Sequence, residues 1–256
     1  MASKPAKASA KAGAEPRPPR MLSLTQLLPN LLTVAAICAG LTAIRYGFLG
    51  AYRMAAALIV LAAVLDGLDG RLARLLQSES AIGAELDSLA DFLNFGVAPA
   101  LVLYLWSLQA ANGAAWIAVL IFAVCCALRL ARFNVGNRSE AAKAENACFT
   151  GVPSPAGALL ALLPLFAGQL LPAALQPPVI LVAAWMIAVG LLMISRMPTP
   201  SLKSARFGTE NARYVVVGFT GLVAAILSYP WTTLVVLDLG YLAALVYTWR
   251  GRRHTS

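Results

Sequence analysis

The sequence predicts an all-α fold, a polytopic membrane helical bundle with about eight transmembrane helices. The chain has 256 residues, of which 60% are hydrophobic and only 12% are charged. This balance is too apolar for a soluble domain of that length. Most of the apolar residues also form runs close to the ~20 residues that a helix needs to cross a bilayer. The expected segments are 28–45, 51–76, 84–107, 114–135, 155–172, 177–196, 213–229 and 231–248.

The domain organisation follows from where the apolar runs begin and end. Residues 1–21 are rich in Ala, Pro, Lys and Arg and have no apolar core, so we expect a disordered basic tail. Residues 22–249 contain every apolar segment and form a single membrane domain. Residues 250–256, RGRRHTS, form a second short basic tail.

The distribution of basic residues predicts the orientation. If the N-terminus is cytoplasmic, only Arg45 and Arg53 of the 20 Lys and Arg residues fall on the outer side. Because cytoplasmic loops carry the excess of Lys and Arg, both termini are expected in the cytoplasm of a multi-pass cell-membrane protein. The net charge of +9 is then a topological signal, and no nucleic-acid partner is expected.

Four aspartates interrupt the apolar pattern where the second segment ends and the third begins. Asp66 and Asp69 are three residues apart, and Asp87 and Asp91 are four apart, so each pair projects from one side of its helix. In the predicted topology all four lie near the cytoplasmic face. Four ionised carboxylates this close need compensating cations, and the two nearby arginines are too few. Oxygen ligands without His or Cys favour a hard divalent ion, Mg²⁺ or Mn²⁺.

Residues around the aspartates indicate a phosphate-bearing ligand. Gly70 and Gly83 each lower helix propensity by roughly 1 kcal/mol relative to Ala, which close approach of a ligand would explain. Arg74 lies one turn beyond Gly70, where it can meet a phosphate. Asn30 and Thr33, one turn apart in the first segment, either bind nucleotide or make hydrogen bonds between helices. Together with the aspartates and their metal ion, these residues predict a site for a pyrophosphate-linked nucleotide at the lipid–water boundary.

The stretch DGLDGRLARLLQSESAIGAELDSLAD, residues 66–91, resembles the signature of the CDP-alcohol phosphatidyltransferase family. The matching positions are Asp66, Asp69, Gly70, Ala73, Arg74, Gly83, Asp87 and Asp91. The resemblance implies that the four aspartates bind metal and that Asp91 is also the general base. It further implies that Gly70, Arg74 and Gly83 contact the CDP moiety, and that the protein is a homodimer.

Two further segments bear on the acceptor alcohol. RLARFNV at 129–135 and FTGVPSPAGA at 149–158 resemble the phosphatidylserine synthase branch of that family. This resemblance implies CDP-diacylglycerol and L-serine as substrates in a lipid membrane. Arg129, Arg132 and Lys203 are candidate partners of the L-serine carboxylate, although each could equally be a topological charge.

Other functions remain open from the sequence. The same donor could react with glycerol 3-phosphate, inositol phosphate or choline. An ion transporter is a second class, because acids inside membranes commonly line ion paths. However, the aspartates lie at one face, and no chain of polar residues continues outward from them. Asp238, the one other intramembrane carboxylate, is not assigned to the reaction.

Overall fold

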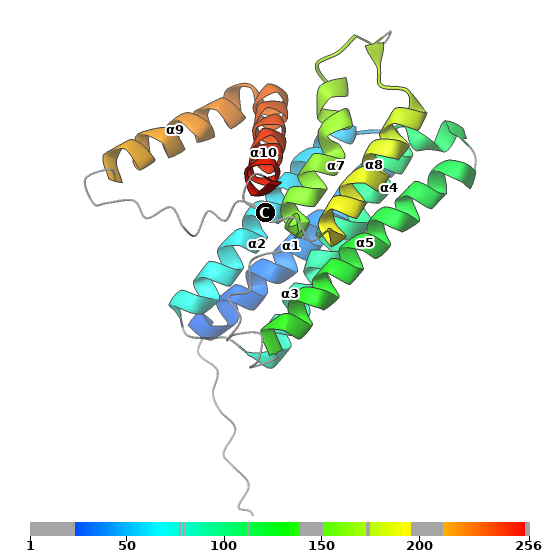
Figure 1. Ribbon diagram of the computed structural model, residues 1–256. Helices are drawn as coiled ribbons and strands as arrows, with labels where there is room; N and C mark the ends of the chain where they lie inside the picture. The colour runs from blue at the N-terminus through cyan, green and yellow to red at the C-terminus, as the bar shows by residue number, and fades with distance from the viewer. Residues whose placement is uncertain are drawn as a thin grey trace, which may run out of the picture.

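The computed structural model describes residues 24–76, 78, 80–111, 113–138, 151–172, 175–195 and 212–253, and these residues form an all-helical bundle (Figure 1). The all-α fold predicted from the sequence is confirmed, and each of the eight predicted apolar segments overlaps a helix; that all eight cross the membrane stays a prediction. The helices are α1 (Leu24–Phe48), α2 (Tyr52–Leu75), α3 (Ala81–Asp91), α4 (Ala98–Trp106), α5 (Gly113–Arg138), α7 (Ser154–Gly168), α8 (Val179–Ile194), α9 (Ala212–Ser228) and α10 (Pro230–Arg253). The expected tail at 1–21 lies outside the described residues.

Helix length and apolarity fit a membrane protein. Within the described part of the chain, four helical stretches are long and apolar enough to cross a bilayer: Leu27–Phe48, Ile82–Trp106, Ala115–Gly136 and Pro230–Arg250. The apolar helices α7, α8 and α9 are shorter, with 15, 16 and 17 residues. At 1.5 Å per residue these helices are roughly 23 to 26 Å long, somewhat less than the ~30 Å hydrocarbon core.

The turn between α1 and α2 makes the two helices antiparallel neighbours. Gly50 has φ +71°, a left-handed conformation that favours glycine. The Ala51 amide donates to the Tyr46 carbonyl at 2.9 Å and closes the turn. Because the turn is this short, the N-terminal part of α1 lies beside the C-terminal part of α2, where two of the aspartates are located.

The third pass is one continuous helical run from Ala81 to Trp106 with a change of geometry inside it. Ser80 caps its start, with the hydroxyl accepting from the Gly83 amide at 3.0 Å. After Asp91 the helix widens into a π-helical stretch, η1 (Phe92–Val97), before α4 continues. Such π-helical insertions frequently occur at functional sites.

The core is formed where these passes meet. α1 packs on α2, α5 packs on α8, and α10 packs on α7. The α5–α8 contact uses small residues, as is common between membrane helices: a Cβ added at Gly190 would lie 3.3 Å from the Phe122 Cα. In the α7–α10 contact the rings of Phe166 and Trp231 lie 6.2 Å apart.

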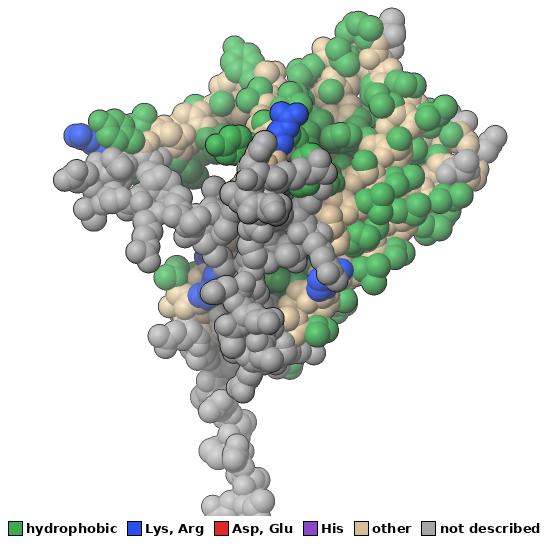
Figure 2. Space-filling model, viewed as in Figure 1, with side chains coloured by type: hydrophobic (Ala, Val, Ile, Leu, Met, Phe, Trp, Pro, Cys, Tyr) green, Lys and Arg blue, Asp and Glu red, His purple; other side chains and the backbone are tan. Residues whose placement is uncertain are grey.

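The outer face of α5 and α8 is apolar. Figure 2 shows hydrophobic side chains over this face. They include Ile117, Leu120, Val124 and Leu128 of α5 and Ile180, Leu181 and Leu191 of α8, all exposed. In water such a surface would be an aggregation hazard, whereas in lipid it is solvated. The exposed face and the long helices together identify an integral membrane protein.

Candidate active site

Three aspartates from two helices converge at one end of the bundle. Asp66 and Asp69 lie in the last turns of α2, and Asp87 lies in α3. One carboxylate oxygen from each lies within 4.8 Å of the others. The α2 and α3 backbones make few close contacts with each other, and α1 packs against both, so the side chains connect the two helices.

The geometry of these three aspartates fits a divalent cation. Oxygens that coordinate one ion at 2.0–2.6 Å can be at most about 4 to 5 Å apart, which agrees with the 4.8 Å limit. Without a cation, each ionised pair at that separation would repel by about 3 kcal/mol at an effective dielectric constant of 20. Asp69 is only 3% exposed, and its Oδ1 has no hydrogen-bond partner, which leaves that atom available as a ligand. Asp66, Asp69 and Asp87 could therefore hold a metal ion.

Helix α1 supports this cluster through Thr33. The Thr33 hydroxyl donates to Asp69 Oδ2 at 2.7 Å and also lies 3.1 Å from the Pro29 carbonyl oxygen. Thr33 is 5% exposed, so the contact excludes water. This contact directs one Asp69 oxygen toward α1 and leaves the other for the cluster. The sequence predicted either nucleotide binding or a hydrogen bond between helices for Thr33, and the structure contains the hydrogen bond.

Asp91 lies beside the cluster but outside the group of three. Its carboxyl group interacts electrostatically with that of Asp66, and its Oδ1 is buried without a hydrogen-bond partner among the described residues. It is the last residue of α3, directly before the π-helical stretch η1. This electrostatic interaction places Asp91 near the three aspartates. Metal ligation by Asp91 and its role as general base stay predictions.

The predicted CDP-binding residues lie around the same helix ends. A Cβ added at Gly70 would meet nothing within 4 Å, so the backbone there is open to a ligand. A Cβ at Gly83 would lie 2.9 Å from Asn30 Oδ1, which places Asn30 beside Gly83. Arg74 is exposed, and its Nε donates to the Gly70 carbonyl at 2.9 Å. Contact of these residues with CDP stays a prediction.

The predicted serine-binding residues have different surroundings. Arg129 is half-buried, interacts electrostatically with Asp91, and donates a hydrogen bond to the Ser154 hydroxyl. Arg132 is exposed and donates to the Ile194 carbonyl at 3.2 Å, at the C-terminal end of α8, where a cation is favourable. Lys203 lies outside the described residues. Of these three predicted serine-binding residues, Arg129 is the one that the structure places near an aspartate of the site, Asp91.

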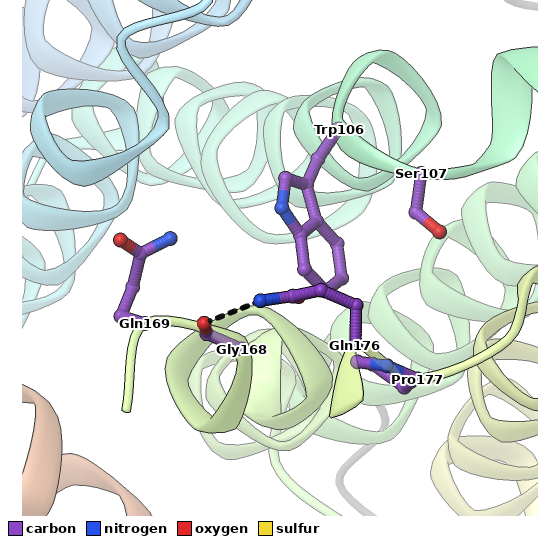
Figure 3. A pocket seen from close by; sticks show the side chains of 6 residues that line it. All are labelled: Trp106, Ser107, Gly168, Gln169, Gln176 and Pro177. Atoms are coloured by element: carbon purple, nitrogen blue, oxygen red, sulfur yellow. Dashed lines mark hydrogen bonds between the residues drawn. The ribbon is translucent and has the colours of Figure 1, made fainter. Parts of the chain in front are cut away.

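A separate cavity of about 300 Å³ lies at the other end of the third pass (Figure 3). It is lined by Trp106, Ser107, Gly168, Gln169, Gln176 and Pro177. Gln176 donates to the Gly168 carbonyl at 2.9 Å, beside the Trp106 ring. Its lining contains no carboxylate and no other charged side chain, so this cavity lacks metal ligands and is not the candidate active site.

Some polar residues near the site were not singled out from the sequence. Ser154 contacts Arg129 and lies inside the FTGVPSPAGA segment, which was a usable signal. Asn94 is fully buried in η1 with both amide atoms unpaired, and a polar residue in an apolar run is also a signal. Tyr241 interacts electrostatically with Arg129 from α10, and nothing in the sequence indicated this proximity.

Comparison with known proteins identifies the family. The family model for CDP-alcohol phosphatidyltransferase matches residues 26–194. The chain belongs to the CDP-alcohol phosphatidyltransferase family. The matched region contains the aspartate cluster, Arg129 and Ser154, whereas the hairpin of α9 and α10 lies beyond it. The family resemblance stated from residues 66–91 is confirmed.

Relatives from bacteria and archaea carry the same name. A CDP-diacylglycerol–serine O-phosphatidyltransferase of Mycobacterium leprae is 38% identical over 240 residues, which cover 93% of this chain and 79% of the relative. A protein of that name from Helicobacter pylori is 34% identical over 197 residues, covering 77% of this chain and 81% of the relative. One from Methanocaldococcus jannaschii is 37% identical over 175 residues, which cover 68% of this chain and 73% of the relative.

Proposed function

We propose that this protein is a phosphatidylserine synthase. It transfers the phosphatidyl group from CDP-diacylglycerol to the hydroxyl of L-serine and releases CMP, as a step of phospholipid biosynthesis. The observation that carries the proposal is the convergence of Asp66, Asp69 and Asp87 at one end of a membrane bundle. The names of the relatives, CDP-diacylglycerol–serine O-phosphatidyltransferase, support the choice of donor and acceptor.

The reaction breaks the phosphoanhydride bond of the donor and forms a phosphoester bond to serine. The serine hydroxyl oxygen forms a bond to the phosphorus that bears diacylglycerol, and the bond from that phosphorus to the bridging oxygen breaks, so CMP leaves with that oxygen. The hydroxyl proton passes to Asp91, whose Oδ1 is buried and unpaired. A positioned general base of this kind contributes typically 10² to 10⁴ in rate.

The metal is Mg²⁺ or Mn²⁺, held by Asp66, Asp69 and Asp87, with Asp91 as a further ligand. When bound, it neutralises negative charge on the pyrophosphate. Gly70 and Gly83 let the nucleotide approach the helix backbones. Arg74 supplies a cation for a phosphate once its guanidinium releases the Gly70 carbonyl, and Asn30 lies beside Gly83 for contact with the nucleotide.

The setting of the reaction is the cytoplasmic face of the cell membrane. The proposal includes eight transmembrane passes, both termini in the cytoplasm, basic tails at 1–21 and 250–256 around the membrane domain 22–249, and a homodimer. The excess of Lys and Arg on one side of the predicted topology supports this orientation. The lipid tails of the donor stay in the bilayer, while its nucleotide reaches the polar end of the bundle.

CMP release from purified protein tests the function. The protein is incubated with CDP-diacylglycerol, Mn²⁺ or Mg²⁺, and one candidate alcohol at a time: L-serine, glycerol 3-phosphate, inositol phosphate or choline. We expect release with L-serine and the formation of phosphatidylserine. Release with another alcohol but not with L-serine would contradict the proposed acceptor while leaving the donor intact.

A matched pair of variants tests the site. Asp87→Asn removes one charge from the cluster, and Asp238→Asn removes the charge of a buried carboxylate in α10 that we do not assign to the reaction. We expect CMP release to fall at least 100-fold in Asp87→Asn and to stay near the wild-type rate in Asp238→Asn. Equal losses in the two variants would indicate a general effect of altering buried acids and would remove the evidence for the cluster.

A further inference from the structure

Helix α10 places a buried polar group next to the candidate active site. The Tyr241 hydroxyl is buried and has no hydrogen-bond partner among the residues that the structure describes. Its helix packs beside α7 (Figure 1). A buried tyrosine hydroxyl usually finds a partner, because leaving it unpaired in an apolar environment is costly. The missing partner of Tyr241 is therefore a feature that a ligand can explain.

Arg129 connects Tyr241 to the reacting end of the bundle. Its guanidinium interacts electrostatically with Asp91 and with Tyr241. It also donates to the Ser154 hydroxyl. Helices α3, α5, α7 and α10 thus each contribute one polar side chain to the same neighbourhood. An arginine has five N–H donors, so the bond to Ser154 leaves donors for an additional acceptor.

The two unpaired oxygens around Arg129 have opposite hydrogen-bonding needs. Asp91 Oδ1 is a buried carboxylate oxygen that accepts a hydrogen bond, and the Tyr241 hydroxyl can donate one. Both side chains interact electrostatically with the Arg129 guanidinium. A ligand that fits this arrangement carries a hydroxyl for Asp91 and, at its other end, an anionic group for Arg129 and Tyr241. L-serine has both groups on a three-carbon frame.

We propose that Tyr241 is an acceptor-binding residue, which together with Arg129 holds the carboxylate of L-serine while the serine hydroxyl faces Asp91. This inference rests on the proposed phosphatidylserine synthase function and adds α10, which lies outside the family-matched region, to the acceptor site. Choline has no anionic group and would leave the Tyr241 hydroxyl and Arg129 without an anionic partner, so the pair discriminates against choline.

The test is Tyr241→Phe, which removes one hydroxyl oxygen and preserves the ring. A lost hydrogen bond to a charged group predicts a rise in the KM for L-serine of about ten- to a hundredfold. The KM for CDP-diacylglycerol and the Mn²⁺ dependence should stay at wild-type values. Tyr247→Phe is the matched control, because Tyr247 is on the same helix with 81% of its surface exposed, and it should change none of these values.

A second readout separates substrate contact from a structural role. L-Serinamide lacks the carboxylate charge and is measured as a competitive inhibitor against L-serine. Wild-type protein should bind L-serine more tightly than the amide, and Tyr241→Phe should reduce this preference by about the same factor as it raises the KM. A rise in the KM for CDP-diacylglycerol of equal size, or an unchanged preference for L-serine, would overturn the inference.

The inference and the proposed function fail in different ways. If wild-type protein releases no CMP with L-serine, the proposed function is wrong. If wild-type protein is active with L-serine and Tyr241→Phe has the wild-type KM for L-serine, only the role of Tyr241 is wrong.

Discussion

Replacing Thr33 with valine tests how α1 supports the aspartate cluster. Valine has nearly the same shape as threonine, so the change removes the 2.7 Å hydrogen bond to Asp69 Oδ2 and the 3.1 Å contact with the Pro29 carbonyl and preserves the packing. A hydrogen bond to a charged acceptor contributes about 1.5–3 kcal/mol, which corresponds to roughly 10- to 150-fold in an equilibrium constant. Removing a side chain that orients a metal ligand typically costs 10- to 100-fold in metal affinity. The two values agree.

We therefore expect Thr33→Val to raise the Mn²⁺ concentration that gives half-maximal CMP release by about 10- to 100-fold. Direct Mn²⁺ binding, measured by electron paramagnetic resonance on purified protein without substrate, should weaken by the same factor. Thr33→Ser keeps the hydroxyl and should retain most of the affinity.

The matched control is Thr42→Val in the same helix. The Thr42 hydroxyl also donates to the carbonyl four residues before it, that of Cys38 at 2.6 Å, but it has no carboxylate partner in the described residues. We expect Thr42→Val to leave Mn²⁺ binding unchanged. If Thr33→Val bound Mn²⁺ as tightly as the wild type, or if both valine variants weakened binding equally, the proposed support of Asp69 by Thr33 would be refuted.

Further predictions concern the base, the nucleotide site and the packing. Asp91→Asn should lower CMP release by at least 100-fold while nucleotide binding, measured by displacement of a labelled CDP-diacylglycerol, stays detectable; normal turnover would remove Asp91 from the role of base. Gly83→Ala should raise the KM for CDP-diacylglycerol several-fold, because the new Cβ would lie 2.9 Å from Asn30 Oδ1. In Gly70→Ala the new Cβ has no neighbour within 4 Å in the protein, so only the bound ligand could contact it. Gly157→Ala should destabilise the protein by about 1–3 kcal/mol, since its Cβ would lie 2.5 Å from the buried Met193 Sδ. Thermal unfolding in detergent measures the last effect, with Gly218→Ala, which has open space around it, as control.

The sequence predicted the helices well because their cause is local. An apolar run of spanning length has to pair its backbone groups within itself in lipid, so it becomes a helix whatever packs beside it. The boundaries differ by a few residues where a side chain sets them. The predicted segment 84–107 begins three residues earlier in the structure, at Ala81, because Ser80 caps the helix.

Part of the candidate site was also predictable from local spacing. Intervals of three and four residues put Asp66 beside Asp69 and Asp87 beside Asp91 on their helices, and the connection between α2 and α3 is short. The spacing therefore predicted that the two pairs face each other. In the structure one oxygen each of Asp66, Asp69 and Asp87 lies within 4.8 Å of the others. The widening of the helix after Asp91 had no recognised signal, because a π-helical stretch depends on packing around it.

What the sequence by itself determined is the class of molecule: helices long enough for a bilayer, carboxylates at one end of them, and a family signature at residues 66–91. The tertiary structure decided which side chains complete the site. Thr33 lies 36 residues before Asp69, and Tyr241 is 112 residues after Arg129, so no periodic pattern relates them. The Thr33–Asp69 hydrogen bond arises from how α1 packs on α2, and the interaction of Tyr241 with Arg129 from where the packing of α10 on α7 places Tyr241; interactions between helices depend on the shapes of both surfaces.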